Sequence, residues 1–152
     1  MQLSPSTRRR YRVDRLDTSE PPKPHKPRKP HTPAPNTAPV IIWAGDVLHD
    51  DYILPFKFDG ILYASAAIAL EAQRDHIGPL SAKTDDAWLM AALRVLRAKF
   101  EDEQAAAALC ETGAARLVHS GLTPFWNGSL TQNGIAGKNK IGQMLEVVRY
   151  DI

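Results

Sequence analysis

Several residue types and motifs are rare or missing in this sequence, and each absence argues against a class of protein. Cys110 is the only cysteine in 152 residues, so no internal disulfide can form, which fits a reducing compartment or a protein indifferent to redox conditions. No apolar run comes near the roughly 20 residues of a membrane-spanning helix, and no apolar signal segment follows Arg8–Arg10. Phosphate-binding glycine loops, paired-cysteine metal motifs and a serine triad are missing too. We therefore expect no membrane contact, no secretion by a signal peptide, no cofactor and no metal site.

Proline and basic residues are concentrated in the first quarter of the chain. Residues 1–39 hold nine of the 12 prolines and 9 of the 19 Lys and Arg residues against 3 acids, a net charge of +6. Residues 40–152 hold 10 basic and 14 acidic residues, a net charge of −4. The formal net charge of +2 therefore conceals two parts of opposite sign. We predict a basic, proline-rich extended arm over residues 1–39 and one folded domain over residues 40–152.

The arm has a composition that excludes regular secondary structure. In residues 21–30 nearly every position is a proline or a cation, which rules out a helix or a central strand and predicts polyproline II or disorder. Besides a solvated linker, two functions fit this composition. The cations can release counterions from nucleic acid, or the arm can lie extended in a groove of a larger protein assembly.

The folded part begins with patterns typical of strands. Val40–Trp43 is a short run of residues that favour strands. Phe56–Phe58 and Ile61–Tyr63 flank Asp59-Gly60, the pair that a type I′ turn prefers, so a β-hairpin is predicted. Two further pairs are candidates for short strands or buried extended segments: Leu117–Val118 and Phe125–Trp126.

Helical patterns fill most of the remainder. Helices are predicted over about residues 66–76 and 85–103, with a continuation or restart over residues 104–112. The proposed start and stop residues are Ser65 and Gly78-Pro79 for the first helix, Thr84 for the second and Gly113 for the third. The predicted fold class is α+β, a single and mainly helical domain with a small sheet.

The segment Gly137–Arg149 predicts a final helix with a polar start. Its apolar residues repeat at i, i+3, i+4 and i+7: Ile141, Met144, Leu145 and Val148. Lys138, Asn139 and Lys140 form the first turn, where free amide groups beside two cations suit a phosphate or carboxylate. An ordinary core helix with a basic first turn explains the same spacing.

An ordered set of short motifs resembles one known family. In chain order they are Leu96–Phe100, Leu109, Thr112-Gly113, Leu117-Val118, Trp126–Gly128, Gly137–Asn139, Ile141-Gly142, Leu145 and Arg149. They follow the order of the K-F, L-x-x-T-G, L-V-E, W-G-x-G, G-x-N-x-L-G and L-M-x-x-R motifs of the NADAR (YbiA-like) N-glycosidase family. The resemblance implies the α+β fold of that family and chemistry on the N-glycosidic bonds of N-ribosyl or ADP-ribosyl compounds.

The catalytic carboxylates of that family have no counterpart in this chain. Tyr63–Arg74 aligns without gaps onto the family helix S-x-E-H-x-x-x-A-x-K, which places Ala67 where the family has its glutamate. The family aspartate before the tryptophan falls on Thr123 or Pro124, and the family S-N pair falls on His49-Asp50. A methyl group cannot do acid–base work, so the resemblance implies a degenerate catalytic site.

Two remaining acids are the candidate catalytic residues. Glu71 lies four residues after Ala67 and projects from the same helical face, about 6 Å further along the axis. Asp50 offers a second carboxylate from the loop before the hairpin. For Glu71, an exposed pair with Arg74 is favoured over catalysis. The candidate ligand-binding residues are Trp88, Trp126, Asn127, Lys138 and Asn139; core packing of Trp126 and helix capping by Asn139 are the structural alternatives.

Four residues outside this set carry structural expectations. Cys110 follows an alanine run and is expected to be a buried small apolar residue. His76 and His119 show no metal-ligand spacing and are expected on the surface or in turns. Arg149 matches the family's terminal arginine and is expected in a buried ion pair.

These observations favour one function over two others. The leading hypothesis is a catalytically degenerate NADAR-like domain that serves as a binding or structural module. In this hypothesis its arm anchors it to a larger assembly, such as a nucleic-acid-containing virion, in the cytoplasm or the particle. The alternative is a divergent N-glycosidase or ADP-ribosyl hydrolase that uses Glu71 and Asp50. A third hypothesis is nucleic-acid binding through the basic arm.

Overall fold

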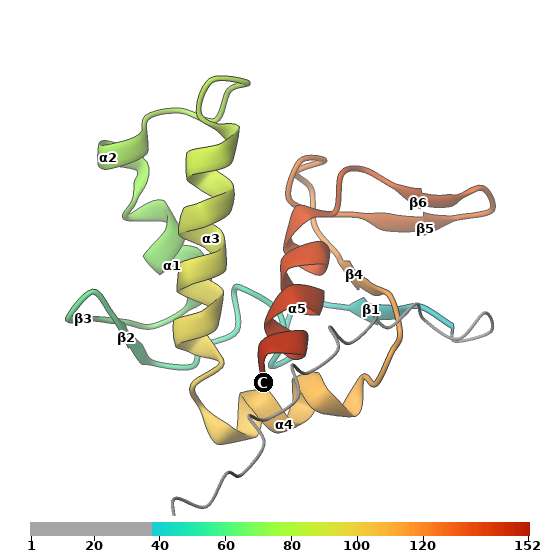
Figure 1. Ribbon diagram of the computed structural model, residues 1–152. Coiled ribbons are helices and arrows are strands. Elements are labelled where there is room, and N and C mark those ends of the chain that lie inside the picture. The colour runs from blue at the N-terminus through green and yellow to red at the C-terminus, as the bar shows by residue number, and fades with distance from the viewer. Residues whose placement is uncertain (1–37) are drawn as a thin grey trace, which may run out of the picture. The chain divides into compact units, whose positions relative to one another are not determined.

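The computed structural model describes residues 38–152, and Figure 1 shows their arrangement. The elements in chain order are β1 (Val40–Ile42), β2 (Phe56–Phe58), β3 (Ile61–Tyr63), α1 (Ala66–Glu71), α2 (Arg74–Ile77), α3 (Asp85–Lys99), α4 (Glu103–Glu111), β4 (Leu117–His119), β5 (Ser129–Thr131), β6 (Gly134–Ala136) and α5 (Lys140–Asp151). The described part is a mainly helical α+β domain, as predicted. The structural predictions for residues 1–37 of the arm lie outside the described residues.

β1 and β4 form a parallel pair inside the core. Val40 lies opposite Leu117 and Ile42 opposite His119, so the carboxyl ends of both strands meet at one edge. Ile42 and Leu117 are fully buried, as expected for strands covered on both faces. The strands predicted at Val40–Trp43 and Leu117–Val118 are confirmed.

The other edge of β4 is paired by side chains of α5 and of the residue before it. The Leu117 N–H donates to Glu146 Oε1 over 2.8 Å, and Asn139 Nδ2 donates to the Leu117 carbonyl over 2.8 Å. Asn139 Oδ1 accepts the His119 N–H over 3.0 Å. Buried backbone groups require partners, so these side chains serve where a third strand would.

α5 lies against α3 (Figure 1), and it buries the apolar stripe that its spacing predicts. The four apolar residues of that stripe are all buried: Ile141, Met144, Leu145 and Val148. Gly142 lies between them and faces the Leu117 carbonyl, where a side chain would have no room. A glycine in mid-helix therefore allows α5 to approach β4 closely.

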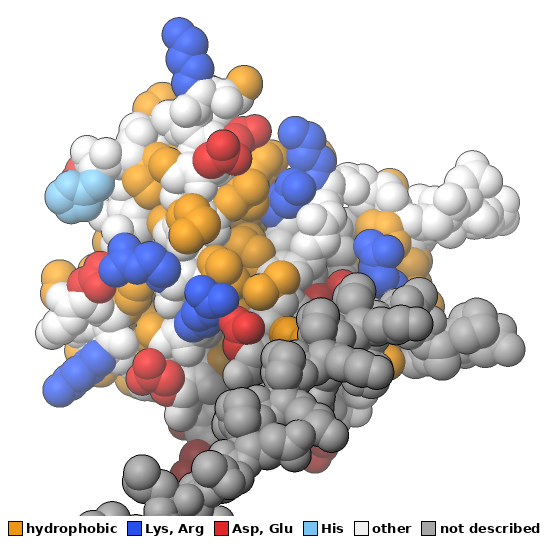
Figure 2. All heavy atoms as spheres, in the orientation of Figure 1, with side chains coloured by type: hydrophobic (Ala, Val, Ile, Leu, Met, Phe, Trp, Pro, Cys, Tyr) orange, Lys and Arg blue, Asp and Glu red, His pale blue; other side chains and the backbone are white. Residues whose placement is uncertain are grey.

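The hairpin of β2 and β3 forms at the predicted Asp-Gly pair. Asp59 and Gly60 have φ of 48° and 81°, the positive values that a type I′ turn requires. Arg94 of α3 donates to Asp59 over 2.7 Å and lies over the Phe58 ring, which ties the hairpin to α3. On the face of the molecule that Figure 2 shows, hydrophobic side chains are interspersed with Lys, Arg, Asp and Glu.

Helix boundaries differ from the predictions in two places. Ser65 caps α1 by accepting the Ile68 N–H, as predicted, but the helix breaks after Glu71 because the Gln73 N–H bonds to the Leu70 carbonyl three residues back. The helix predicted over residues 85–103 ends at Lys99. A new helix, α4, begins after the N-cap residue Asp102, whose side chain accepts the Ala105 N–H. Thr84 makes no side-chain capping bond; it braces the loop before α3 instead.

Three further structural expectations are wrong. Phe125 and Trp126 lie in a turn, and the nearby strands β5 and β6 form a second hairpin that the sequence reading missed. Cys110 is exposed on the outer face of α4. Arg149 has no ion-pair partner within residues 38–152; its guanidinium donates to Thr112 Oγ1 and to the Ala115 carbonyl.

No helix within residues 38–152 has the length and apolar content that crossing a bilayer would require.

Gly142→Ala should destabilise the domain although alanine favours helices. The added Cβ would overlap the Leu117 carbonyl and lie 2.5 Å from Asn139 Oδ1, so the bonds between Asn139 and β4 cannot survive unchanged. We expect a loss of about 2 to 4 kcal/mol in urea unfolding, against a helix-propensity gain of about 1 kcal/mol. Val147→Ala on the exposed face of the same helix is the control, expected within about 0.5 kcal/mol of wild type. Equal stability of the Gly142 variant would contradict the close approach.

Candidate functional site

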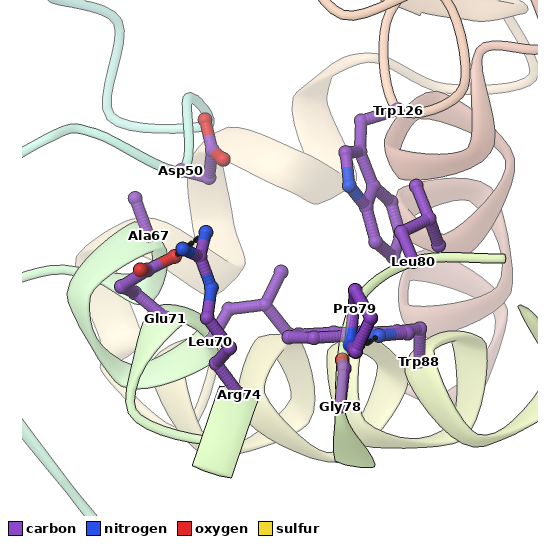
Figure 3. Close-up of a pocket in the computed structure, with 10 residues that line it drawn as sticks. All are labelled: Asp50, Ala67, Leu70, Glu71, Arg74, Gly78, Pro79, Leu80, Trp88 and Trp126. Carbon is purple, nitrogen blue, oxygen red and sulfur yellow. Dashed lines mark hydrogen bonds and ion pairs between the residues drawn. The ribbon is translucent and has the colours of Figure 1, made fainter. Parts of the chain in front are cut away.

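One pocket of about 500 Å³ opens beside α1, in the size range of small-molecule sites. Figure 3 shows its walls, which come from the loop after β1, from α1 and α2, from the α2–α3 loop, from α3, and from the turn before β5. The lining residues are Asp50, Ala67, Leu70, Glu71, Arg74, Gly78, Pro79, Leu80, Trp88 and Trp126. The pocket therefore joins segments that lie far apart in the sequence.

Two tryptophans form the apolar side of the pocket. Trp88 is buried in α3, and its Nε1–H donates to the Gly78 carbonyl over 3.0 Å, which holds the α2–α3 loop against the helix. Trp126 meets Trp88 edge to face, with ring centroids 6.4 Å apart, and it also meets Phe125 edge to face at 4.7 Å. Trp126 is only partly buried, so its ring both packs on the core and borders the pocket. Such fixed rings can stack a nucleobase or cover a ribose.

The opposite side carries the polar groups. The Ala67 N–H donates to the Asp50 carbonyl over 3.0 Å, so the start of α1 and the loop after β1 are joined there. Glu71 and Arg74 pair at 2.9 Å, with their side chains 61% and 63% exposed. Figure 3 shows this pair near Ala67 and Asp50, with Trp126 and Leu80 across the cavity. The exposed pairing that was favoured for Glu71 is thus the one observed, although the residue also lines the pocket.

Behind Asp50 lie two stacked histidines. The His49 and His119 rings are 4.2 Å apart at an interplanar angle of 23°. Asp50 Oδ1 lies 3.2 Å from His49 Nδ1 and 3.0 Å from His119 Nε2. The expectation that His119 is isolated and superficial is wrong, because its side chain is 1% exposed and belongs to this cluster. His76, in contrast, is exposed on α2, as expected.

Strand pairing explains why sequence spacing did not reveal this cluster. His119 is the last residue of β4, and His49 follows β1 after a turn. Parallel strands present their carboxyl ends at one edge, which is where functional groups of α/β sheets commonly gather. The one available signal was that the family S-N pair falls on His49-Asp50.

Asp50 is held in its ionised form. Burial is the largest single influence and by itself would raise the pKa, but the hydrogen bond with His119 and the charges of His119, His49 and Lys99 oppose it. The net result is a pKa of Asp50 below its ordinary value. A carboxylate that borders the pocket is therefore charged at neutral pH.

Lys99 supports the loop that carries this cluster. Its side chain is fully buried, and its Nζ donates to the His49 carbonyl. Burial lowers the pKa of Lys99 to about 8, against the opposing charges of Asp50, Asp46 and Asp51. The amine thus holds the loop by a direct bond to its backbone, at a cost in desolvation.

The start of α5 is not the anion site that its sequence suggested. The backbone amide groups of residues 138–141 donate to the carbonyl groups of residues 124–127, at 2.6 to 3.3 Å. The turn before β5 therefore occupies the amides that a phosphate would need. Lys138 instead places its Nζ 5.1 Å from the centroid of the Phe125 ring.

The structure brings together only part of the predicted site. Asp50, Glu71, Trp88 and Trp126 line the pocket, and Asn127, Lys138 and Asn139 are not among its lining residues. The missed lining residues include Arg74, whose guanidinium is the pocket's cation.

The two asparagines serve the scaffold instead. Asn139 is buried and makes no capping bond; both of its amide atoms bond β4. Asn127 Oδ1 lies 2.7 Å from His119 Nδ1, so it orients that ring.

Comparison with known proteins supports the fold. No family model matches the chain, and no curated protein matches it by sequence. The NMR structure of the E. coli protein YbiA is similar to it with a TM-score of 0.62 and 21% sequence identity, over 76% of this chain and 84% of that chain. This domain therefore has a divergent NADAR-like, or YbiA-like, fold, as the ordered motifs predicted.

Lys99→Met should change how the stability of the domain depends on pH. The pKa of Lys99 is about 8 in the folded chain against an ordinary 10.5, so between these values the unfolded chain binds more protons and the folded state gains stability as the pH rises. We expect the wild type to gain about 2 kcal/mol over the variant between pH 7 and pH 10 in urea unfolding. An equal change in both proteins would show that Lys99 titrates normally and lies in contact with water.

Proposed function

We propose that this domain binds an N-ribosyl or ADP-ribosyl compound in the pocket beside α1 and does not cleave it. The observation that carries this proposal is Ala67, whose methyl group lies in the pocket wall at the position that aligns with the family glutamate. The nearest acid on the same helix, Glu71, is exposed and paired with Arg74. A site that keeps its walls and lacks a proton-transfer group at that position suits binding without turnover.

The chemistry of the pocket supports this class of ligand. Trp88 and Trp126 offer an apolar wall for a planar base, and Arg74 offers a cation for a phosphate at the opposite side. Asp50 can accept hydrogen bonds from ribose hydroxyl groups because its carboxylate is ionised. Base, sugar and phosphate each have a matching group within one cavity.

A divergent N-glycosidase is the second candidate, and Asp50 is the observation that favours it. The carboxylate borders the pocket close to Ala67, stays ionised and is oriented by two histidines. A fixed negative charge can stabilise an oxocarbenium-like centre, and Glu71 would have to leave Arg74 to act as the acid.

Binding of ADP-ribose should depend on Trp126. Replacement by leucine removes the ring that borders the cavity, and we expect about 10-fold weaker binding in calorimetry, since a stacked aromatic contact contributes roughly 1 to 3 kcal/mol. Trp43→Leu is the matched control, because Trp43 is 63% exposed and does not line the pocket. The same titrations, followed by chromatography of the ligand, detect any released base or ribose.

The outcomes separate the two candidates. Saturable binding with intact ligand supports the binding module. Release of product that Asp50→Asn abolishes would establish the enzyme instead. Ligand binding that neither Trp126→Leu nor Arg74→Met weakens would show that the ligand lies elsewhere.

The role of the arm in anchoring the domain to a larger assembly, such as a virion, remains part of this proposal. Its support is the segregation of charge, +6 in residues 1–39 against −4 in residues 40–152. Charge of one sign on a proline-rich segment suits either a groove in a protein assembly or a nucleic acid.

Deleting residues 1–37 should leave the domain folded. β1 begins at Val40, and residues 38–152 contain a hydrophobic core of their own, so we expect a melting temperature within about 2 °C of the full chain. Binding of the full chain to an oligonucleotide of about 30 nucleotides, measured by anisotropy, tests nucleic acid as the arm's partner. Salt-sensitive binding that the deletion removes favours nucleic acid, and its absence favours a protein groove. Unfolding of the shortened chain would show that the arm belongs to the fold.

A further inference from the structure

Three ligand-type atoms converge at the carboxyl ends of β1 and β4. His49 Nδ1, Asp50 Oδ1 and His119 Nε2 all lie within 4.8 Å of one another. The carboxylate oxygen is 3.2 Å from the first nitrogen and 3.0 Å from the second. These separations resemble the roughly 3.3 Å between neighbouring ligands of a tetrahedral ion whose bonds are about 2.0 Å long.

The outer nitrogen of each histidine is already committed as a donor. His49 Nε2 lies 3.1 Å from the Ser120 carbonyl, which can only accept, and His119 Nδ1 lies 2.7 Å from Asn127 Oδ1. In the neutral rings the proton is therefore on the outer nitrogen, and the inner nitrogens carry lone pairs. Histidine ligands of metal ions are oriented in this way, with the second ring nitrogen donating to a carbonyl or amide oxygen.

The inner nitrogens have weak partners in the present arrangement. They accept the backbone N–H groups of Asp50 and Asp51 at 3.3 and 3.2 Å, which are long hydrogen bonds. Each also lies beside Asp50 Oδ1, so a ring that carries a second proton donates it to the carboxylate. A divalent cation placed among the three atoms would take the place of such a proton.

The cluster is closed on one side and open on the other. His49 and His119 are 6% and 1% exposed at their side chains, whereas Asp50 is 22% exposed and lines the pocket. An ion held there would have protein ligands behind it and a vacant position toward the cavity. Catalytic metal sites share this layout of three protein ligands and one open position.

We propose that His49 Nδ1, His119 Nε2 and Asp50 Oδ1 bind one divalent transition metal ion of the zinc type, with its open position facing the pocket. Two histidines and one carboxylate suit Zn²⁺, Fe²⁺ and Co²⁺ better than Mg²⁺ or Ca²⁺, which prefer oxygen ligands. Binding requires the inner nitrogens to exchange the long bonds from the backbone for the ion, and the stacked rings, now 23° from parallel, to tilt so that both lone pairs meet it. The inference is independent of the proposed ribosyl ligand, because metal binding is measured without it.

Calorimetric titration of the metal-free full chain with Zn²⁺, and absorption spectra with Co²⁺, test this site. We expect one ion per chain, a rise in melting temperature with Zn²⁺, and the visible bands of Co²⁺ bound to nitrogen and oxygen ligands. Removing an outer partner of a metal ligand costs about 10- to 100-fold in affinity, so Asn127→Ala should weaken binding by that factor. Removing a ligand, in Asp50→Asn or His119→Gln, should weaken it by at least about 100-fold.

His76→Gln is the matched control, because this histidine is exposed on α2 and does not belong to the cluster. The variant should bind Zn²⁺ as tightly as wild type. Asp50→Asn is nearly isosteric and partly exposed, so it keeps the test decisive if His119→Gln fails to fold. Circular dichroism of each variant establishes that it is folded. Absence of saturable binding to wild type would overturn the proposal. Binding that survives in both folded ligand variants would do the same, and would assign the ion to other groups such as His25, His31 or Cys110.

Discussion

The fold depends on how the backbone N–H and carbonyl groups along the free edge of β4 find hydrogen-bond partners. A two-stranded parallel pair is short of partners, and here Asn139 and Glu146 supply them through side chains. That pairing requires α5 to approach β4 closely, which Gly142 permits. The same approach brings the amides at the start of α5 under the carbonyl groups of the turn that carries Trp126. The scaffold and one wall of the pocket therefore rest on the same contacts.

The cluster of His49, Asp50 and His119 is a second consequence of this arrangement. β4 delivers His119 to the edge where the loop after β1 delivers the other two residues. Lys99 and Asn127 then fix the loop and the ring from behind. The charge of Asp50 is thus maintained in a partly buried place at the side of the pocket. Polar groups that are this well oriented are commonly found where a protein binds or transforms a ligand.

The sequence predicted what depends on neighbouring residues. The hairpin at Asp59-Gly60, the cap at Ser65 and the buried stripe of α5 follow from turn preference, capping and periodicity, and all three are present. The ordered motifs also led to the correct fold. The end of α1 depends on one tightened turn, and the break between α3 and α4 depends on the cap at Asp102. In both places a helix that continues and a helix that stops are close alternatives, which composition does not separate.

What the sequence did not predict depends on distant contacts. The place of His119 in the cluster could not be predicted because His49 and Asp50 are about 70 positions away, and strand pairing brings them together. Asn139 and the amides beside it looked like an anion site because the turn that occupies them cannot be inferred from periodicity. A residue that matches a family motif can thus serve the scaffold, as Asn139 does, while the pocket combines Trp126 of a motif with residues outside the motifs, such as Asp50 and Trp88.

The two histidines are held with their inner nitrogens toward Asp50. Long-range ¹H–¹⁵N NMR spectra of the imidazole rings report which nitrogen carries the proton. We expect a proton on Nε2 of His49 and on Nδ1 of His119, each in slow exchange with water, because both outer nitrogens face oxygen acceptors. Protons found only on the inner nitrogens, or a rapidly exchanging mixture of tautomers, would overturn this arrangement.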